Sequence, residues 1–392
     1  MKSQFGISTL AIHGKIKDRS FRSVVYPIYQ TSTFAVEKSD DYQKFIDDTP
    51  DFYIYSRYGN PTIREVESKI ATIENCEDAV LFSSGMSAIT STILSFTEVG
   101  DEIISLRSIY GVTYRFFRDY LPKFGVKVNF IDLEEIEIID KLITNKTKLI
   151  YFETPINPTT RIVEIQKIIN LSKKHDNILV IIDNTFATPV NQNPANFGVD
   201  IILHSATKYL SGHSDLILGC AISENSKIEK IRKTKSTFGG NPDPFQAFLL
   251  SRSLKTLEIR VKKQNENALE LAKFLSNHSK IKKVLYPGLD SHPEHQIAKN
   301  QMKGFGGMLA FEIDGTLEHA KKFCDSLKVA INATSLGSVE TLVSIPVLTS
   351  HVKMSKDELN KAGISESLIR VSVGIENIED LLWDFEQALN SI

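Results

Sequence analysis

The chain contains 392 residues, of which 42% are hydrophobic and 24% are charged, as is usual for a globular protein with a large core. Its formal net charge is −2 and no strongly basic or acidic block occurs, which argues against a protein that binds nucleic acid or a membrane surface. We find no apolar run long enough to span a bilayer and no signal-peptide pattern, and the three cysteines are sparse, so we expect a reduced, cytoplasmic protein without a disulfide framework.

The first 60 residues mix polar and aromatic side chains with weak periodicity, and we interpret residues 1–60 as an N-terminal arm rather than part of a core. Helical spacing begins near Thr62, and strand-like and helix-like segments then alternate. Several of the strand-like segments are nearly continuous apolar runs, which is typical of a mostly parallel sheet buried on both faces. We therefore expect a large α/β domain over residues 61–250, with seven strands at 79–83, 102–106, 127–132, 148–153, 178–183, 200–205 and 216–222.

The C-terminal part has a different pattern. Residues 244–277 form one long stretch with helical spacing, which is suited to link two domains. Shorter strand-like and helix-like segments follow, so residues 251–392 are predicted to form a smaller α+β domain. GFGG (304–307) is interpreted as a turn into a strand, and HPEH (292–295) as a solvated loop rather than a metal site. The sequence contains no GxxxxGK[ST] pattern, so P-loop phosphate chemistry is not indicated.

Three polar features follow predicted strands, where open α/β sheets usually bind their ligands. The first is FSSGMSAITSTIL (82–94), in which a strand, a small polar turn and a helix follow one another. The amides of Gly85 and Met86 at the start of this helix are suited to bind an anion such as a phosphate. The alternative is a plain N-cap by Ser83 or Ser84.

The second feature is Asp183, which ends a very apolar strand. A buried carboxylate there is costly unless it meets a cation, such as the protonated nitrogen of a heterocycle; the alternative is a capping or turn aspartate. The third feature is SATKYLSGHSD (205–215), in which Lys208 lies between two apolar runs. A partly desolvated lysine is nucleophilic and binds an aldehyde as a Schiff base, and Ser205 and Thr207 offer hydroxyls to a phosphate; the alternative is a surface lysine in a turn. Pyridoxal 5′-phosphate (PLP) satisfies all three features at once.

The chain resembles the Cys/Met-metabolism family of PLP enzymes, which includes cystathionine γ-synthase, cystathionine γ- and β-lyases and methionine γ-lyase. The resemblance is nearly full-length and implies PLP fold type I, the fold of aspartate aminotransferase, with a mostly parallel seven-stranded sheet in the large domain. The motifs that carry it occur in the family's order: VYPIYQTSTF (25–34), YSRYGNPT (55–62), SSGMSAI (83–89), YFETPINP (151–158), DNTFATP (183–189), SATKYLSGHSD (205–215) and LIRVSVGIEN (368–377).

The resemblance also implies roles for single residues. Lys208 would hold the PLP aldehyde and move protons, Tyr110 would stack on the ring and take part in catalysis, and Asp183 would pair with the ring nitrogen. The phosphate would be bound by four residues of the same chain and two of a neighbouring subunit: Gly85, Met86, Ser205 and Thr207, with Tyr55 and Arg57 from the neighbour.

For the substrate, the resemblance implies that Arg370 clamps the α-carboxylate with help from Asn157 and Ser335. It also implies at least a dimer, in which the arm of residues 1–60 reaches a neighbouring subunit, and usually a homotetramer built from two such dimers. The expected partners are an amino-acid substrate and copies of the chain, without nucleic acid, membrane or metal.

The resemblance leaves the reaction open. Family members that handle cystathionine carry acidic residues where this chain has Ile54 and Thr334, and methionine γ-lyases carry cysteine at Val112, whereas Arg115 matches cystathionine-handling members. The leading hypothesis is γ-elimination or γ-replacement on a homocysteine- or homoserine-derived substrate, in sulfur amino-acid metabolism. The alternative is a β-lyase acting on cystathionine or cysteine. An aminotransferase and a non-catalytic binding module are further alternatives, and the intact set of Lys208, Asp183, Tyr110 and Arg370 argues against the latter.

Overall fold

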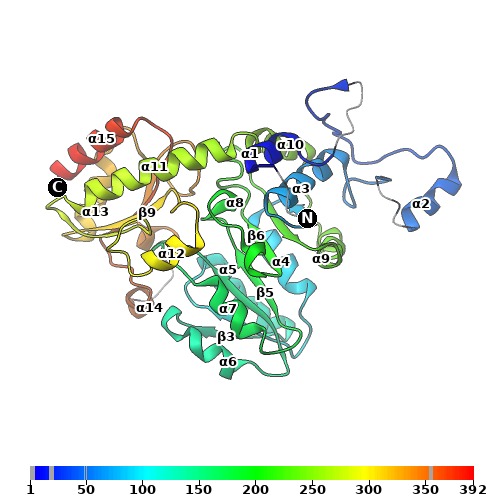
Figure 1. Ribbon diagram of the computed structural model, residues 1–392, viewed down its shortest axis with the longest axis horizontal. Helices are drawn as coiled ribbons and strands as arrows, with labels where there is room; N and C mark the ends of the chain where they lie inside the picture. The colour runs from blue at the N-terminus through cyan, green and yellow to red at the C-terminus, as the bar shows by residue number, and fades with distance from the viewer. Residues whose placement is uncertain (1–4, 17–21, 48, 50, 353–355) are drawn as a thin grey trace.

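The computed structural model describes residues 5–16, 22–47, 49, 51–352 and 356–392 (Figure 1). Its centre is a seven-stranded sheet in the order β1-β7-β6-β5-β4-β2-β3, in which only β7 runs antiparallel to its neighbours. All seven predicted strands are present, and the mostly parallel α/β sheet is confirmed. The strands are β1 Asp78–Phe82, β2 Glu102–Leu106, β3 Lys127–Ile131, β4 Thr147–Glu153, β5 Leu179–Asp183, β6 Ile201–His204 and β7 Gly219–Ser223.

Helices cover both faces of this sheet (Figure 1). Helix α3 shows why they begin where they do: the Asn60 side chain accepts a hydrogen bond from the Thr62 amide at 2.9 Å, and Pro61 occupies the first helical position. The helices around the large sheet are α3 Pro61–Ile73, α4 Gly85–Ser95, α5 Gly111–Arg115, α6 Ile139–Leu142, α7 Ile165–Ser172, α8 Thr188–Asn191, α9 Asn225–Phe238 and α10 Pro244–Leu254.

A second, five-stranded sheet has the order β10-β11-β12-β9-β8, and only the β10·β11 pair is parallel. It confirms the α+β pattern expected for the C-terminal part, and it has its own hydrophobic cluster around Phe311, Phe323 and Phe385. Its elements are β8 Ile281–Leu285, β9 Met308–Ile313, β10 Ile331–Asn332, β11 Leu342–Ser344 and β12 Leu368–Ser372, with helices α12 His295–Gln301, α13 Leu317–Ser326, α14 Lys356–Lys361 and α15 Ile378–Asn390.

The predicted long helix over 244–277 is two helices, α10 and α11 Leu257–Ser276, separated at Lys255 and Thr256. The break is a correction of the prediction: Thr256 leaves the helical region at φ −111°, ψ 8°. Helix α11 still joins the two hydrophobic clusters, because Val261 packs in the first and Leu271 in the second. A domain boundary near residue 250 stays a prediction.

The N-terminal segment is only partly an arm. Helix α1 Ile7–His13 packs against α3 and α11, and Ala11 lies in the main core, which corrects the expectation that no part of this segment joins a core. Helix α2 Tyr42–Ile46 lies away from the body (Figure 1). Residues 1–4, 17–21, 48 and 50 of the predicted arm lie outside the described residues. Within the described part of the chain, no helix has the length and apolarity needed to cross a membrane.

Candidate active site

The candidate residues gather where the parallel strands end. Strands β4, β5 and β6 run side by side in one direction. Strand β7 lies between β6 and β1 and is antiparallel to both, so β1 runs in the same direction as β6. Glu153 and Asp183 are the last residues of β4 and β5, and Lys208 follows four residues after β6. This edge of the sheet is where open α/β sheets bind ligands.

A close turn at the start of α4 forms the expected anion site. The Ser84 hydroxyl oxygen accepts a hydrogen bond from the Ser87 amide at 3.1 Å, so Ser84 is the N-cap. Gly85 and Met86 come next, and amides at these positions have no acceptor within the helix. A Cβ added to Gly85 would lie 2.9 Å from Ser205 Oγ, so only glycine fits here. The N-cap and the anion site are therefore compatible, and the turn lies directly against Ser205.

The two predicted hydroxyl donors differ. The Ser205 side chain lies beside Gly85, while its amide donates to Thr185 Oγ1 at 2.9 Å. The Thr207 hydroxyl donates its one hydrogen to the Leu218 carbonyl at 3.0 Å, and its oxygen accepts from the Leu218 amide at 3.0 Å. Thr207 thus joins the segment after β6 to the segment before β7, and it must rotate its hydroxyl to donate to a phosphate.

Asp183 is a partly buried carboxylate that ends β5. The Thr185 amide donates to Asp183 Oδ1 at 2.9 Å, and within the described residues Asp183 forms no ion pair. Burial raises the pKa of this carboxyl, while the hydrogen bonds from Thr185 act in the opposite direction. The side chain is suited to meet a cation supplied by a ligand.

Lys208 lies in a mostly dry place with a single hydrogen-bond partner for its amine. Nζ donates to Ser335 Oγ at 2.7 Å. Burial, and then the nearby charge of Arg370, lower the pKa of the Lys208 amine to about 8. About a tenth of this amine is therefore neutral and nucleophilic at pH 7, and about half at pH 8. The surface-lysine interpretation does not fit this environment.

Arg370 enters the same space from the second sheet. It lies on β12 and is buried, with Nη1 donating to Asn157 Oδ1 at 3.2 Å and Nη2 to the Ser335 carbonyl at 2.8 Å. Burial lowers the pKa of the guanidinium to about 10, so it stays charged at neutral pH. Its Nε has no hydrogen-bond partner, and that donor is available to a carboxylate. Ser335 therefore contacts both the lysine amine and the arginine.

Tyr110 precedes α5 and is 39% exposed. Its amide donates to Glu153 Oε1 at 3.0 Å, and the Tyr151 hydroxyl donates to the same oxygen at 3.3 Å. Burial raises the pKa of the Tyr110 hydroxyl. Glu153 is a residue of the site that sequence reasoning missed. The signal was present, because a carboxylate ends an apolar strand there as it does at Asp183.

Tyr55 and Arg57 are not brought to these residues within one chain. Arg57 Nη1 donates to the Ser236 carbonyl at 2.8 Å, and its guanidinium lies 4.5 Å from the Tyr58 ring centroid. Tyr55 is 42% exposed and pairs with Thr33 in an isolated β-bridge. Their predicted contact with a cofactor phosphate requires a neighbouring subunit.

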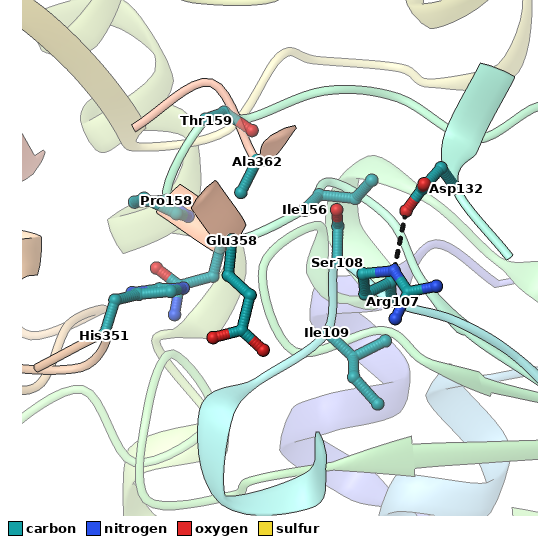
Figure 2. A pocket seen from close by; sticks show the side chains of 11 residues that line it. Arg107, Ser108, Ile109, Asp132, Ile156, Pro158, Thr159, His351, Glu358 and Ala362 are labelled. Carbon is teal, nitrogen blue, oxygen red and sulfur yellow. Dashed lines mark hydrogen bonds and ion pairs between the residues drawn. The ribbon is translucent and has the colours of Figure 1, made fainter. Parts of the chain in front are cut away.

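A small pocket adjoins the site at Asn157 (Figure 2). One wall carries the ion pair in which Arg107 Nε donates to Asp132 Oδ1 at 2.9 Å, and another carries His351. Burial, and then the charge of Arg370, lower the pKa of His351 to about 4. His351 is therefore neutral at physiological pH and adds no charge beside the arginine.

The HPEH segment is not the solvated loop that we expected. His292 is buried, and burial lowers its pKa to about 4, whereas His295 Nδ1 lies 2.8 Å from the Pro287 carbonyl oxygen. The polar and proline residues around His292 favour a solvated loop, but a local polar pattern does not show packing against distant segments. Among the described side chains, no group of three or more His, Cys, Asp or Glu is placed to hold a metal ion.

The residues at this edge fit PLP. Lys208 offers an amine of lowered pKa to the aldehyde, and Asp183 offers the ring nitrogen a carboxylate without an ion-pair partner among the described residues. The start of α4, where a Cβ on Gly85 would crowd Ser205, offers backbone amides to the phosphate. Arg370, with its free Nε, offers an anchor for an α-carboxylate.

Comparisons with known proteins identify the family of the chain. A profile of the family described as Cys/Met metabolism PLP-dependent enzyme matches residues 8–390. The chain is 40% identical to L-methionine gamma-lyase of Fusobacterium nucleatum subsp. nucleatum, covering 99% of this chain and 98% of that protein. It is 38% identical to cystathionine gamma-lyase of Homo sapiens, covering 98% and 93%. Cystathionine gamma-lyase of Lactobacillus plantarum, solved with L-serine, superposes with a TM-score of 0.92 at 38% identity, covering 99% of both chains.

Proposed function

Because the chain belongs to the Cys/Met-metabolism family of PLP-dependent enzymes, we propose that it catalyses γ-elimination from a thioether amino acid of the homocysteine series. The products are a thiol, 2-oxobutyrate and ammonia, with one water consumed. The observation that carries the proposal is that Ser335 contacts both Lys208 and Arg370, a contact that we call the Ser335 junction. Its hydroxyl oxygen accepts a hydrogen bond from Lys208 Nζ at 2.7 Å, and its carbonyl oxygen accepts one from Arg370 Nη2 at 2.8 Å. This junction holds a proton-carrying amine beside a carboxylate anchor.

PLP would be held by residues at the carboxyl ends of the strands. Gly85, Met86 and Ser205 would bind the phosphate, Asp183 the ring nitrogen and Lys208 the aldehyde, with Tyr110 against the ring. When bound, PLP supplies the electron sink that acidifies the substrate Cα–H and allows a sulfur group to leave from Cγ.

The side chains would orient the substrate and move its protons. Arg370 would bind the α-carboxylate through its fork, and Asn157 fixes that fork in place. Lys208, as the free amine, would take the proton from Cα and return protons along the carbon chain. Its pKa of about 8 suits both directions near neutral pH.

The group beyond the sulfur is proposed to be small and uncharged. Thr334 carries no charge, and Ile54 of the neighbouring arm would present an apolar side chain. These residues offer no ion pair to a distal ammonium, which favours an S-alkyl substrate such as L-methionine over L-cystathionine. Four relatives with 39–40% identity are named L-methionine gamma-lyase and four with 38–39% identity are named cystathionine gamma-lyase, so this choice rests on the residues around the distal group.

We also propose that the active unit contains at least two chains and that two such dimers form a homotetramer. Within one chain, Arg57 donates to the Ser236 carbonyl of α9 and Tyr55 pairs with Thr33, and neither reaches Lys208 or Gly85. A neighbour's phosphate would give the arginine an ionic partner. A cytoplasmic location is supported by the three cysteines, all of which are free thiols.

A substrate panel tests the reaction. The holoenzyme is given L-methionine, L-cystathionine, L-cysteine, and O-acetyl- and O-succinylhomoserine with and without a thiol, and the products are identified by mass spectrometry. We expect 2-oxobutyrate and ammonia, with L-methionine turned over best. Pyruvate as the only 2-oxo acid would show β-elimination, a thioether formed only with added thiol would show γ-replacement, and amino transfer without ammonia would show an aminotransferase; each result would contradict the proposal.

A further inference from the structure

Two carboxyl groups end neighbouring strands of the large sheet in register. Glu153 on β4 pairs with Asp183 on β5, and paired residues of adjacent strands lie about 5 Å apart with their side chains on the same face. Both residues are largely buried, and within the described part of the chain neither forms an ion pair. Two like charges at this distance, away from water, oppose one another strongly, so one of the two groups holds a proton.

The hydrogen bonds decide which group keeps the charge. Asp183 accepts from the Thr185 amide, and Thr185 acts to lower the pKa of Asp183 and so stabilises its ionised form. Glu153 receives its two hydrogen bonds, from the Tyr110 amide and the Tyr151 hydroxyl, on Oε1 alone. Its other oxygen, Oε2, is free to carry a proton. Burial and the charge of Asp183 raise the pKa of Glu153 well above its usual value.

We propose that Glu153 is a positioning residue that works as a neutral acid, fixing the backbone at Tyr110 through Oε1 and leaving Asp183 as the only negative charge for the cofactor ring. The protonated nitrogen of the PLP ring would then meet a single carboxylate, that of Asp183. Glu153, being neutral, would hold the Tyr110 backbone without attracting that nitrogen away from Asp183. This inference rests on PLP binding and is independent of the proposed γ-elimination, so a failure of the substrate panel leaves it standing.

The first test compares Glu153→Gln with Glu153→Ala in titrations of apoenzyme with PLP. Glutamine reproduces the neutral acid and keeps an acceptor for Tyr110 and Tyr151, so the Kd should stay within about threefold of the original enzyme. Alanine removes the acceptor and should weaken binding roughly tenfold or more. Loss of affinity in Glu153→Gln equal to that in Glu153→Ala would overturn the proposal, because it would show that the charge is needed.

The second test counts protons. Calorimetric titration with PLP in buffers of different ionisation enthalpy gives the protons exchanged on binding. If Glu153 is neutral before and after binding, the original enzyme and Glu153→Gln exchange the same number. A difference near one proton would show that Glu153 ionises in the holoenzyme and would overturn the proposal.

The third test uses the apoprotein, so it does not depend on the cofactor. A carboxyl whose pKa is raised on folding contributes stability below its unfolded pKa, and this contribution is lost as the pH rises through its folded pKa. Asp183, Tyr110 and Tyr151 act directly on the pKa of Glu153. His204 acts on Asp183, and Arg115 and Arg370 act on Tyr110, so these three affect Glu153 only indirectly. Glu153→Gln should therefore lose less stability than the original chain as the pH rises above about 4.3, the pKa of an unfolded glutamate, towards the raised pKa of folded Glu153.

Glu67 provides a matched control for this third test. It is also buried, but it forms ion pairs with Arg64 and Arg232, and Arg232 is the first of the charges that hold its pKa below the usual value against the effect of burial. Glu67→Gln should lower the melting temperature because it removes a paired charge, whereas Glu153→Gln should not. Equal destabilisation by the two variants would contradict a neutral Glu153.

Discussion

Replacing Gly85 by alanine tests whether the start of α4 holds the cofactor phosphate. The new Cβ would lie 2.9 Å from Ser205 Cβ and Oγ and 3.1 Å from Ser205 Cα, so the turn or the serine must move. Either movement displaces an amide or a hydroxyl from the phosphate. One hydrogen bond to a charged group contributes about 1.5–3 kcal/mol, so we expect PLP to bind roughly 10- to 150-fold more weakly.

The fold itself should tolerate this change, because alanine is favoured over glycine in a helix by about 1 kcal/mol, which offsets part of the crowding. The assay is a fluorescence titration of apoenzyme with PLP, together with the melting temperature of the apoprotein. Gly6→Ala is the matched control, since no atom lies within 4 Å of its added Cβ, and it should bind PLP normally. An unchanged Kd in Gly85→Ala would refute the assignment of the phosphate to this turn.

Two further predictions concern the amine and the anchor. The rate at which apoenzyme takes up PLP should rise with pH through about 8, because the neutral Lys208 amine is the nucleophile; a rate independent of pH between about 6 and about 10 would contradict the lowered pKa. Arg370→Lys keeps the charge but loses the fork, so kcat/KM should fall roughly 10- to 150-fold, mainly through a higher KM, while PLP affinity is unchanged. A fall in kcat alone would show that Arg370 does not bind the ground-state carboxylate.

Much of the large sheet was predictable because its strands are buried on both faces and therefore appear as apolar runs. The same logic identified Asp183 and Lys208, since a charged residue within or at the end of such a run needs a partner. Glu153 could have been predicted for the same reason, because it ends an apolar strand as Asp183 does. The motif resemblance drew attention to the neighbouring TPINP residues instead.

Other features could not be predicted from local patterns. The break at Thr256 lies within an uninterrupted series of apolar positions, so periodicity alone extends the helix through it. His292 is buried by packing between segments distant in sequence, which the polar residues around it conceal. The roles of Tyr55 and Arg57 depend on a second chain, and neither the sequence nor one folded chain shows where that chain lies.

Borohydride reduction of the holoenzyme followed by peptide mass spectrometry tests the central claim most directly. Lys235 provides the comparison, because burial lowers its pKa to about 8 as well, yet it lies in another pocket, beside Glu67 and Arg232. We expect a phosphopyridoxyl group on Lys208 alone, with no labelling in Lys208→Ala and full labelling of Lys208 in Lys235→Met. Label on Lys235 or another lysine, or none on Lys208, would contradict it.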